Sequence, residues 1–190
     1  MPQPLRQMER QSEAAVSDEV RDGAPASGMS AWRFRLVVLR HDRAVHRLAA
    51  ALLRDAREAE DVAQEAFLSY WRKGAGVERP REWLLRVTRN ACLERLRRSG
   101  RSVSYEQAEI PEPSHERDPA WHYEHDELAA ELRKRVDTLP EPHRSLIVLF
   151  DVQGVDGATC ARILGLNVNQ VKVYLHRARR RLREQLEQQS

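Results

Sequence analysis

Apolar residues recur at intervals of three and four along separate segments of this 190-residue chain, and this spacing decides its fold class. The first such segment begins near Ala31. Its apolar positions are Phe34, Val37, Val38, Val45, Leu48, Ala49 and Leu52. No segment alternates apolar and polar residues over more than a few positions, as a half-buried strand would. We therefore predict an all-α protein.

Two further helices of the first half follow from the same spacing and from residues that end or begin helices. One carries an apolar stripe from Ala59 to Trp71 and ends at Gly74 and Gly76, because glycine suits a C-terminal cap. The next begins at Pro80, since proline is tolerated in the first turn of a helix. It runs to Arg98, before Gly100.

A second set of helices is predicted beyond residue 126. Pro140 and Pro142 separate its first helix from the next, which ends at Gly154. The apolar positions of the first two predicted helices run from Leu128 to Leu139 and from Leu146 to Phe150, and the other two helices cover Ala158 to Leu164 and Val168 to Gln185.

Composition divides the chain into two small helical domains with a tail and a linker. Residues 1–30 are mixed in charge, contain Pro, Gly and Ser, and lack a periodic apolar set, so we expect a disordered N-terminal tail. Residues 101–126 hold three prolines and most of an acidic block, which predicts a flexible acidic linker. The domains are then residues 31–100 and 127–190.

Charge is strongly segregated, although the formal net charge is only +3. The stretch 79–101 carries a net +6, the stretch 102–131 carries −8, and the stretch 170–183 carries +6. Clustered Lys and Arg displace counterions from phosphates, so two basic blocks indicate a polyanionic partner touched at two places. The alternative is that each block is a solvated helix face.

The second domain contains the spacing of a helix-turn-helix. Ala161, Gly165 and Val171 provide a small residue at a helix crossing, a turn glycine and an apolar contact on the second helix. Asn167 can cap that helix. The same helix bears a basic face of Lys172, His176, Arg177, Arg179, Arg180, Arg181 and Arg183. A helix of this kind suits the major groove of DNA, whereas the spacing alone also occurs in packed helical hairpins.

The segment 55–72 is acidic in its first turns and aromatic in its last. Acidic residues at a helix start are favoured by the macrodipole, which explains part of the pattern. The segment nevertheless carries more acids than a cap needs: Asp55, Glu58, Glu60, Asp61 and Glu65. We expect a protein-docking surface here.

Several classes of protein are not indicated. The longest apolar run, Leu48 to Leu53, is far shorter than the roughly 20 residues of a membrane span, and the N-terminus lacks a signal segment. Cys92 and Cys160 are expected in the core rather than in a disulfide framework. We find no metal-ligand spacing, catalytic constellation or cofactor motif. We expect a non-enzymatic, soluble cytoplasmic protein without cofactor or metal.

Three segments, in order, resemble bacterial RNA polymerase sigma factors of the extracytoplasmic-function (ECF) group. Residues 55–72 resemble the family segment "DAEDLVQEtFLraW". Residues 80–98, PREWLLRVTRNACLERLRR, resemble "PRaWLfrIaRNlalDhLRR". Residues 139–184 resemble the promoter-reading segment that begins "LPeehRevllL" and includes "TVKsrLhRArrrLre".

This resemblance implies a subunit that binds core RNA polymerase, recognises the −10 and −35 promoter elements and promotes DNA melting. It assigns binding of the coiled coil of the largest polymerase subunit to Glu60, Asp61, Gln64, Glu65, Phe67 and Trp71. It assigns the −10 element to Trp83, Arg86, Arg89, Asn90, Arg95, Arg97 and Arg98. It assigns the −35 element to Asn169, Gln170, Lys172, Val173, His176, Arg177 and Arg179. An anti-sigma partner is also implied. For Trp83, core packing is an equal alternative.

Some residues depart from the family pattern. Gln170 stands where the family has Thr, and Val173-Tyr174 stands for Ser-Arg, so the −35 sequence cannot be carried over. The alternative functions are a free-standing helix-turn-helix regulator and a protein that titrates another regulator. An operator-binding dimer does not need the acidic and aromatic helix 58–72 followed by a basic helix.

Overall fold

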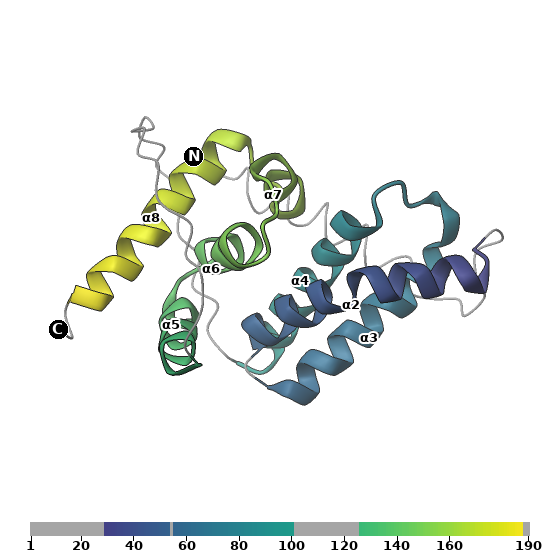
Figure 1. The fold of residues 1–190 in the computed structure, drawn as a ribbon, viewed down its shortest axis with the longest axis horizontal. Coiled ribbons are helices and arrows are strands. Elements are labelled where there is room, and N and C mark those ends of the chain that lie inside the picture. The colour runs from purple at the N-terminus through teal and green to yellow at the C-terminus, as the bar shows by residue number, and fades with distance from the viewer. Residues whose placement is uncertain (1–28, 54, 101–125, 188–190) are drawn as a thin grey trace.

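The computed structural model describes residues 29–53, 55–100 and 126–187, and all the regular structure in them is helical. Three long helices form the first domain: α2 (Ala31–Leu53), α3 (Ala56–Lys73) and α4 (Pro80–Arg98). A short turn of 3₁₀ helix, η1 (Gly74–Gly76), follows α3. Each of the three helices packs against the other two, as Figure 1 shows.

The ends of these helices follow from local chemistry. The Asp55 side chain caps α3 by accepting from the backbone N–H groups of Arg57 at 2.8 Å and Glu58 at 2.9 Å. Gly74 ends α3 with a φ of 71°, a conformation that favours glycine. Pro80 stands in the first turn of α4. The predicted start of α2 near Ala31, the end of α3 at Gly74 and both bounds of α4 are confirmed.

The second domain contains α5 (Asp126–Thr138), α6 (His143–Leu146), α7 (Gly157–Leu164) and α8 (Val168–Glu187). The helix predicted to contain Leu146 to Phe150 and to end at Gly154 is divided in the structure. Its first turn is α6, and it continues as a π-helical stretch, η2 (Ile147–Val152). Gly154 then leaves the helix with a φ of 63°.

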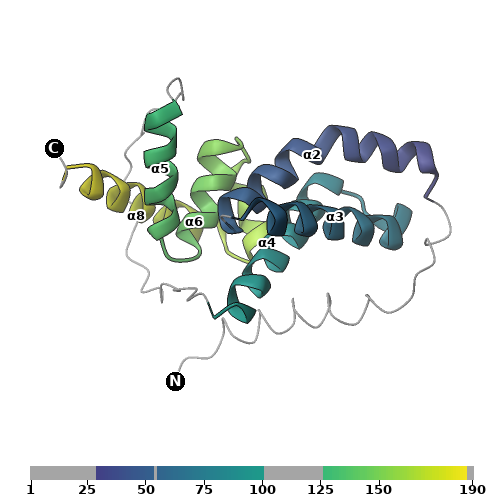
Figure 2. The same ribbon diagram turned by 90° about the horizontal axis from the view of Figure 1, so that it is seen from below.

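The apolar core is continuous between the two domains. One cluster of buried side chains lies wholly in the first domain: Val45, Ala63, Ala66, Phe67, Tyr70 and Leu84. The larger cluster begins with Leu48, Leu52 and Leu85 in the first domain and extends to Leu149 and Ile163 in the second. The C-terminal half of α2 and helix α4 therefore share a core with α6 and α7. Helix α6 lies beside α2 in Figures 1 and 2.

The prediction of an all-α chain with two helical domains is confirmed. The expected tail over 1–30 and the expected linker over 101–126 lie outside the described residues, apart from Met29, Ser30 and Asp126, the first residue of α5. None of the described helices has the length and apolar content needed to cross a bilayer.

Candidate polymerase and nucleic-acid interfaces

The outer face of α3 brings together four of the residues assigned to polymerase binding. Glu60, Asp61, Gln64 and Glu65 are all exposed. The Gln64 side-chain amide donates to the Glu60 carboxylate at 2.9 Å, which holds these two side chains along the helix. The face therefore offers acidic and amide groups to an incoming partner.

The two aromatic residues of the same set lie elsewhere. Phe67 is 7% exposed and belongs to the core cluster between α2, α3 and α4. Trp71 is half-buried, and its ring meets that of Phe34 edge-on with 5.0 Å between centroids. Both side chains thus stabilise the packing of α3, and the acidic face is separate from them.

Arg95 of α4 is bound to α3. Its guanidinium donates to the Glu58 backbone carbonyl at 2.9 Å and to the Glu65 carboxylate at 2.7 Å, and it lies 3.8 Å from the Asp61 carboxylate. Arg95 therefore joins the acidic face to the basic helix.

The other residues assigned to the −10 element are distributed along α4. Trp83 packs on Tyr70 with 5.8 Å between ring centroids. This contact corresponds to the core-packing alternative for Trp83. Arg86 and Asn90 are half-buried. Arg97 and Arg98 are exposed at the end of the helix and pair with Glu94 at 3.4 and 2.8 Å.

Arg89 differs from these residues because it points into the second domain. It is 9% exposed, donates from Nε to the Ser145 hydroxyl at 3.1 Å and lies 3.6 Å from the Glu141 carboxylate. The structure thus places a residue assigned to DNA at the contact between the domains.

The helix-turn-helix has well-defined ends. The Asp156 side chain caps α7 by accepting from the Thr159 backbone N–H at 2.9 Å, and its hydrogen bonds to Thr159 lower the Asp156 pKa. Gly165 takes a left-handed φ of 67° in the turn, as the spacing predicted. Asn167 and Gln170 then cap α8 reciprocally at 2.8 Å.

The face of α8 assigned to the −35 element overlaps this cap, because Gln170 belongs to both. Asn169, Lys172 and His176 are exposed, and Val173 and Arg177 are half-buried. The opposite face is buried in the core and consists of Val171, Tyr174, Leu175, Ala178 and Leu182. The helix is thus amphipathic in the way that the sequence predicted.

Arg179, also assigned to the −35 element, is bound within its own domain. Its guanidinium donates to both carboxylate oxygens of Asp151, at 2.5 and 3.2 Å, and lies over the Phe150 ring at 5.8 Å from the centroid. The fork geometry of arginine makes such a bidentate pair strong. In this structure Arg179 therefore stabilises the contact of α8 with η2.

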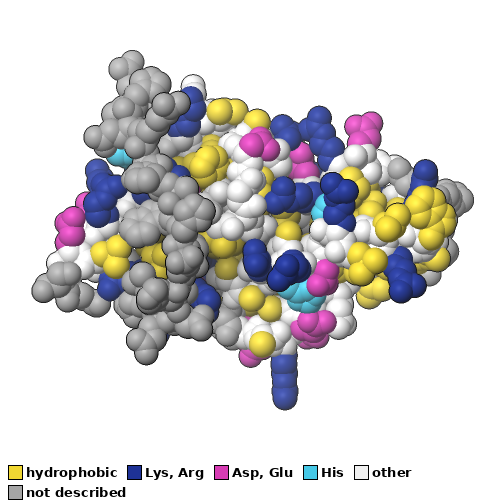
Figure 3. Space-filling model, in the orientation of Figure 1, with side chains coloured by type: hydrophobic (Ala, Val, Ile, Leu, Met, Phe, Trp, Pro, Cys, Tyr) yellow, Lys and Arg dark blue, Asp and Glu magenta, His cyan; other side chains and the backbone are white. Residues whose placement is uncertain are grey.

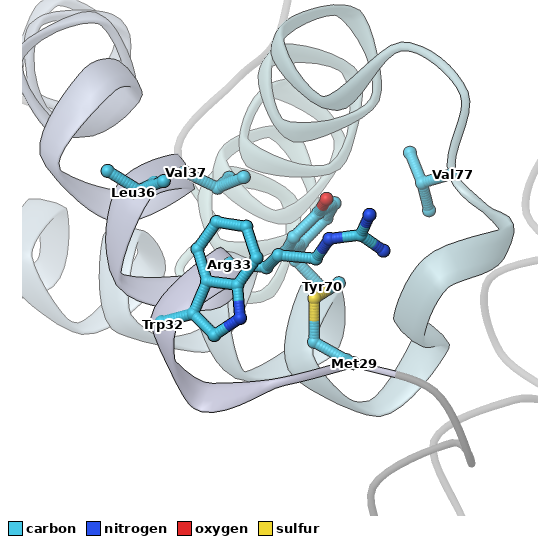
Figure 4. A pocket seen from close by; sticks show the side chains of 7 residues that line it. All are labelled: Met29, Trp32, Arg33, Leu36, Val37, Tyr70 and Val77. Atoms are coloured by element: carbon cyan, nitrogen blue, oxygen red, sulfur yellow. The ribbon is translucent and has the colours of Figure 1, made fainter.

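One exposed feature was not predicted from the sequence. Trp32, Leu36 and Leu39 form an apolar stripe on α2 and are 62%, 56% and 70% exposed. Trp32 and Leu36 also line a cavity of about 350 Å³ with Tyr70 and Val77 (Figure 4). In Figure 3, hydrophobic side chains gather at the N-terminal end of α2, and Lys and Arg side chains lie across the middle of the face. The helical spacing of Trp32, Leu36 and Leu39, which are four and three residues apart and lie on a different stripe from Phe34, is the sequence feature that could have predicted this surface.

Both cysteines lie in the described part of the chain. Cys92 and Cys160 are buried, as expected, and burial raises the pKa of each thiol to about 12. No group of three or more His, Cys, Asp or Glu residues that could hold a metal ion occurs in the described part of the chain.

Comparison with protein families identifies both domains. Residues 37–102 match the family model of Sigma-70 region 2, and residues 129–182 match that of Sigma-70, region 4. We therefore refer to the first domain (α2 to α4) as region 2 and to the second (α5 to α8) as region 4.

Curated relatives and solved structures agree with these matches. The ECF RNA polymerase sigma factor SigE of Mycolicibacterium smegmatis is 31% identical over 183 residues, which cover 93% of this chain and 68% of the relative. The ECF sigma factor SigM of Mycobacterium tuberculosis is 36% identical over 156 residues, with coverage of 80% and 76%.

Two solved structures are similar to the whole fold. CnrH, solved in complex with the cytosolic domain of CnrY, matches with a TM-score of 0.63 and 22% identity over 96% of this chain and 98% of its own. The sigma factor RpoE of Bartonella quintana, solved with the anti-sigma factor NepR, matches with a TM-score of 0.62 and 25% identity, covering 81% and 96%.

A free-standing regulator that binds operators does not account for region 2. Both regions occur here in order, and the relatives extend over most of the chain. Sigma factors are non-catalytic subunits of RNA polymerase that act in the initiation of transcription. This chain belongs to the ECF group of RNA polymerase sigma factors.

Proposed function

We propose that α8 reads the −35 element of the promoter from the major groove. Asn169, Lys172 and His176 are exposed on the first half of the helix, and Arg177 stands beside them. The reciprocal cap fixes the N-terminal end of α8, where the helix dipole favours a phosphate. Base-edge contacts come from the N-terminal part of a recognition helix, which is where these side chains lie.

The basic helix α4 is proposed to hold the −10 element in its melted form. Arg97 and Arg98 are exposed at its C-terminal end, and Arg86 and Asn90 are accessible in part. Unstacking costs a few kcal/mol for each extruded base, which backbone charge and capture of the base offset. Arg95 and Trp83 contribute by positioning α4, because both pack on α3.

The acidic face of α3 is proposed to bind the coiled coil of the largest polymerase subunit. Asp61, Gln64 and Glu65 are the central residues of that face. The observation that carries the whole proposal is the presence in one chain of this exposed acidic face and of two basic helices on separate domains. A protein that binds operators alone needs only one of these three surfaces.

The partner and the compartment belong to the same proposal. Both similar structures are complexes, one with the cytosolic domain of CnrY and one with the anti-sigma factor NepR. We infer that an anti-sigma protein covers the basic faces of this chain as well and that the chain acts in the cytoplasm, where core polymerase and DNA are present.

Run-off transcription with core RNA polymerase tests the proposal. The purified chain is mixed with core enzyme and a library of genomic upstream fragments, and transcript ends are sequenced. Transcripts that start at common positions downstream of a shared pair of elements support it. Lys172→Ala should weaken them, and Arg133→Ala, which removes an exposed cation from α5, is the control. No discrete start site from any fragment would refute the proposal.

A further inference from the structure

Region 4 is bound to region 2 by a network of charged side chains that includes a buried carboxylate. Glu141, just before α6, is 1% exposed, and Ser145 of α6 is fully buried. The Ser145 hydroxyl donates to Glu141 at 2.6 Å and accepts from Arg89 Nε of α4 at 3.1 Å. Arg144 also donates to Glu141, at 3.3 Å. The carboxylate thus has one guanidinium from its own region and one from region 2.

Three further polar contacts join the two regions. Arg162 of α7 pairs with Glu82 of α4 at 2.9 Å. Arg81 donates to the Gln153 backbone carbonyl at 3.2 Å, and the Gln153 side chain donates to the Ala44 carbonyl at 3.2 Å. Together with the shared apolar core, these contacts fix how region 4 is oriented on region 2.

The arrangement in which region 4 is docked on region 2, called the closed form below, conflicts with simultaneous reading of two promoter elements. The −10 and −35 elements are about 25 base pairs apart, which is roughly 85 Å of duplex at about 3.4 Å per base pair. Helices α4 and α7 are in direct contact here. Region 4 must therefore leave α4 before α4 and α8 can each occupy its own element.

From these observations, and resting on the proposed role of α4, we infer that Glu141 acts as an internal phosphate mimic that holds Arg89. A carboxylate and a phosphate oxygen both accept from the arginine fork. Arg89 can serve either Glu141 or the nucleic-acid backbone, so docking of region 4 and binding of single-stranded DNA by α4 exclude each other. Arg89 is then a positioning residue of the closed form, exchanged to DNA on opening.

The interdomain distance in the full chain tests the closed form without polymerase or promoter. Fluorescent dyes are attached at Ala50→Cys on α2 and Glu187→Cys on α8, two exposed positions. Glu82→Arg and Arg162→Glu should each raise the open population about fivefold and lower energy transfer, and the double variant should restore it. Glu78→Arg is the matched control, because it makes the same charge change at an exposed position four residues before Glu82. Unchanged energy transfer in both single variants overturns the inference.

The second measurement tests the exchange at Arg89. A 20-nucleotide dT strand titrated into the labelled chain should lower energy transfer as it binds. Glu141→Gln, which keeps the shape but removes the charge, should tighten binding of the strand about two- to tenfold. The inference is overturned if the strand binds without loss of energy transfer. It is also overturned if Glu141→Gln binds the strand with the same affinity as the parent chain. If Glu141→Gln loses its helical circular dichroism, the affinities of Glu82→Arg, Arg162→Glu and the double variant for the dT strand decide instead.

The two experiments separate this inference from the proposed function. Promoter-specific transcripts with no effect of the charge exchange on energy transfer would refute the internal mimic and leave the sigma role intact. A closed form that opens on dT strands, with no promoter-specific transcript, would refute the promoter role and retain the interdomain contact.

Discussion

Asn167 and Gln170 cap the recognition helix by exchanging hydrogen bonds. The Asn167 side chain accepts from the Gln170 backbone N–H, and the Gln170 side chain accepts from the Asn167 backbone N–H, both at 2.8 Å. Gln170 replaces the threonine of the family pattern, and its side chain is used to hold the start of α8. The departure at this position therefore has a structural reason.

Removing this cap should destabilise region 4. Asn167→Ala is expected to lower the free energy of unfolding by about 1 kcal/mol, because an orphan amide loses its acceptor. Gln170→Ala should also lower it, since its reciprocal bond is lost. Urea unfolding followed by circular dichroism measures both, with Asn169→Ala, the exposed neighbour, as the control. Equal stability of all three variants and the parent chain would contradict the capping role.

Arg177→Ala should weaken promoter binding by about 1–3 kcal/mol if the guanidinium reads a base. The Arg177 side chain is half-buried. It lies in sequence between the exposed His176 and the buried Ala178. Filter binding of the holoenzyme to a promoter duplex and to a scrambled duplex measures the loss. An equal loss on both duplexes would identify Arg177 as a phosphate contact instead.

Asp61→Arg should impair binding to core polymerase without unfolding region 2. Asp61 is exposed on the acidic face of α3, and the new cation would lie near Arg95, 3.8 Å from the native carboxylate. Fluorescence anisotropy with core enzyme measures affinity, and far-ultraviolet circular dichroism checks the fold. Arg57→Glu, an exposed charge change at the start of α3, is the control. Unchanged affinity of Asp61→Arg would place the polymerase contact elsewhere.

The two thiols should resist modification in the folded chain. Burial raises the pKa of Cys92 and Cys160 to about 12, so both stay protonated at pH 8, where only a thiolate reacts. Absorbance with a disulfide reagent should show slow release in buffer and rapid release of two equivalents in guanidinium chloride. Rapid release from the folded chain would mean that the core around α4 or α7 opens readily.

Stability should decrease when the pH falls below about 6.5 because of His41. Burial, and then Arg40 and Arg81, lower the pKa of this histidine from 6.5. Below its ordinary pKa the unfolded chain binds a proton that the folded chain does not, so acid favours unfolding. His41→Gln should show a smaller loss of melting temperature between pH 7.5 and 5.5 than the parent chain. Equal losses would assign the pH dependence to other groups.

The sequence by itself determined the helices, their ends and the chemistry of their faces. Spacings of three and four located α2, α3, α4 and α8, because a helical period needs only local information. Turn and cap residues such as Gly165 and Asn167 act within a few positions of the chain, so their roles could also be predicted. The resemblance of three ordered motifs then indicated the family, which the comparisons show.

Only the tertiary structure decided which of these charged side chains are free to meet a partner. Arg89 and Arg179 belong to basic helices in sequence, yet one lies on Ser145 and Glu141 and the other on Asp151. Their partners are 28 to 56 residues away in the chain. Local periodicity carries no information about such distant pairs, because they form only when separate helices pack on a common core.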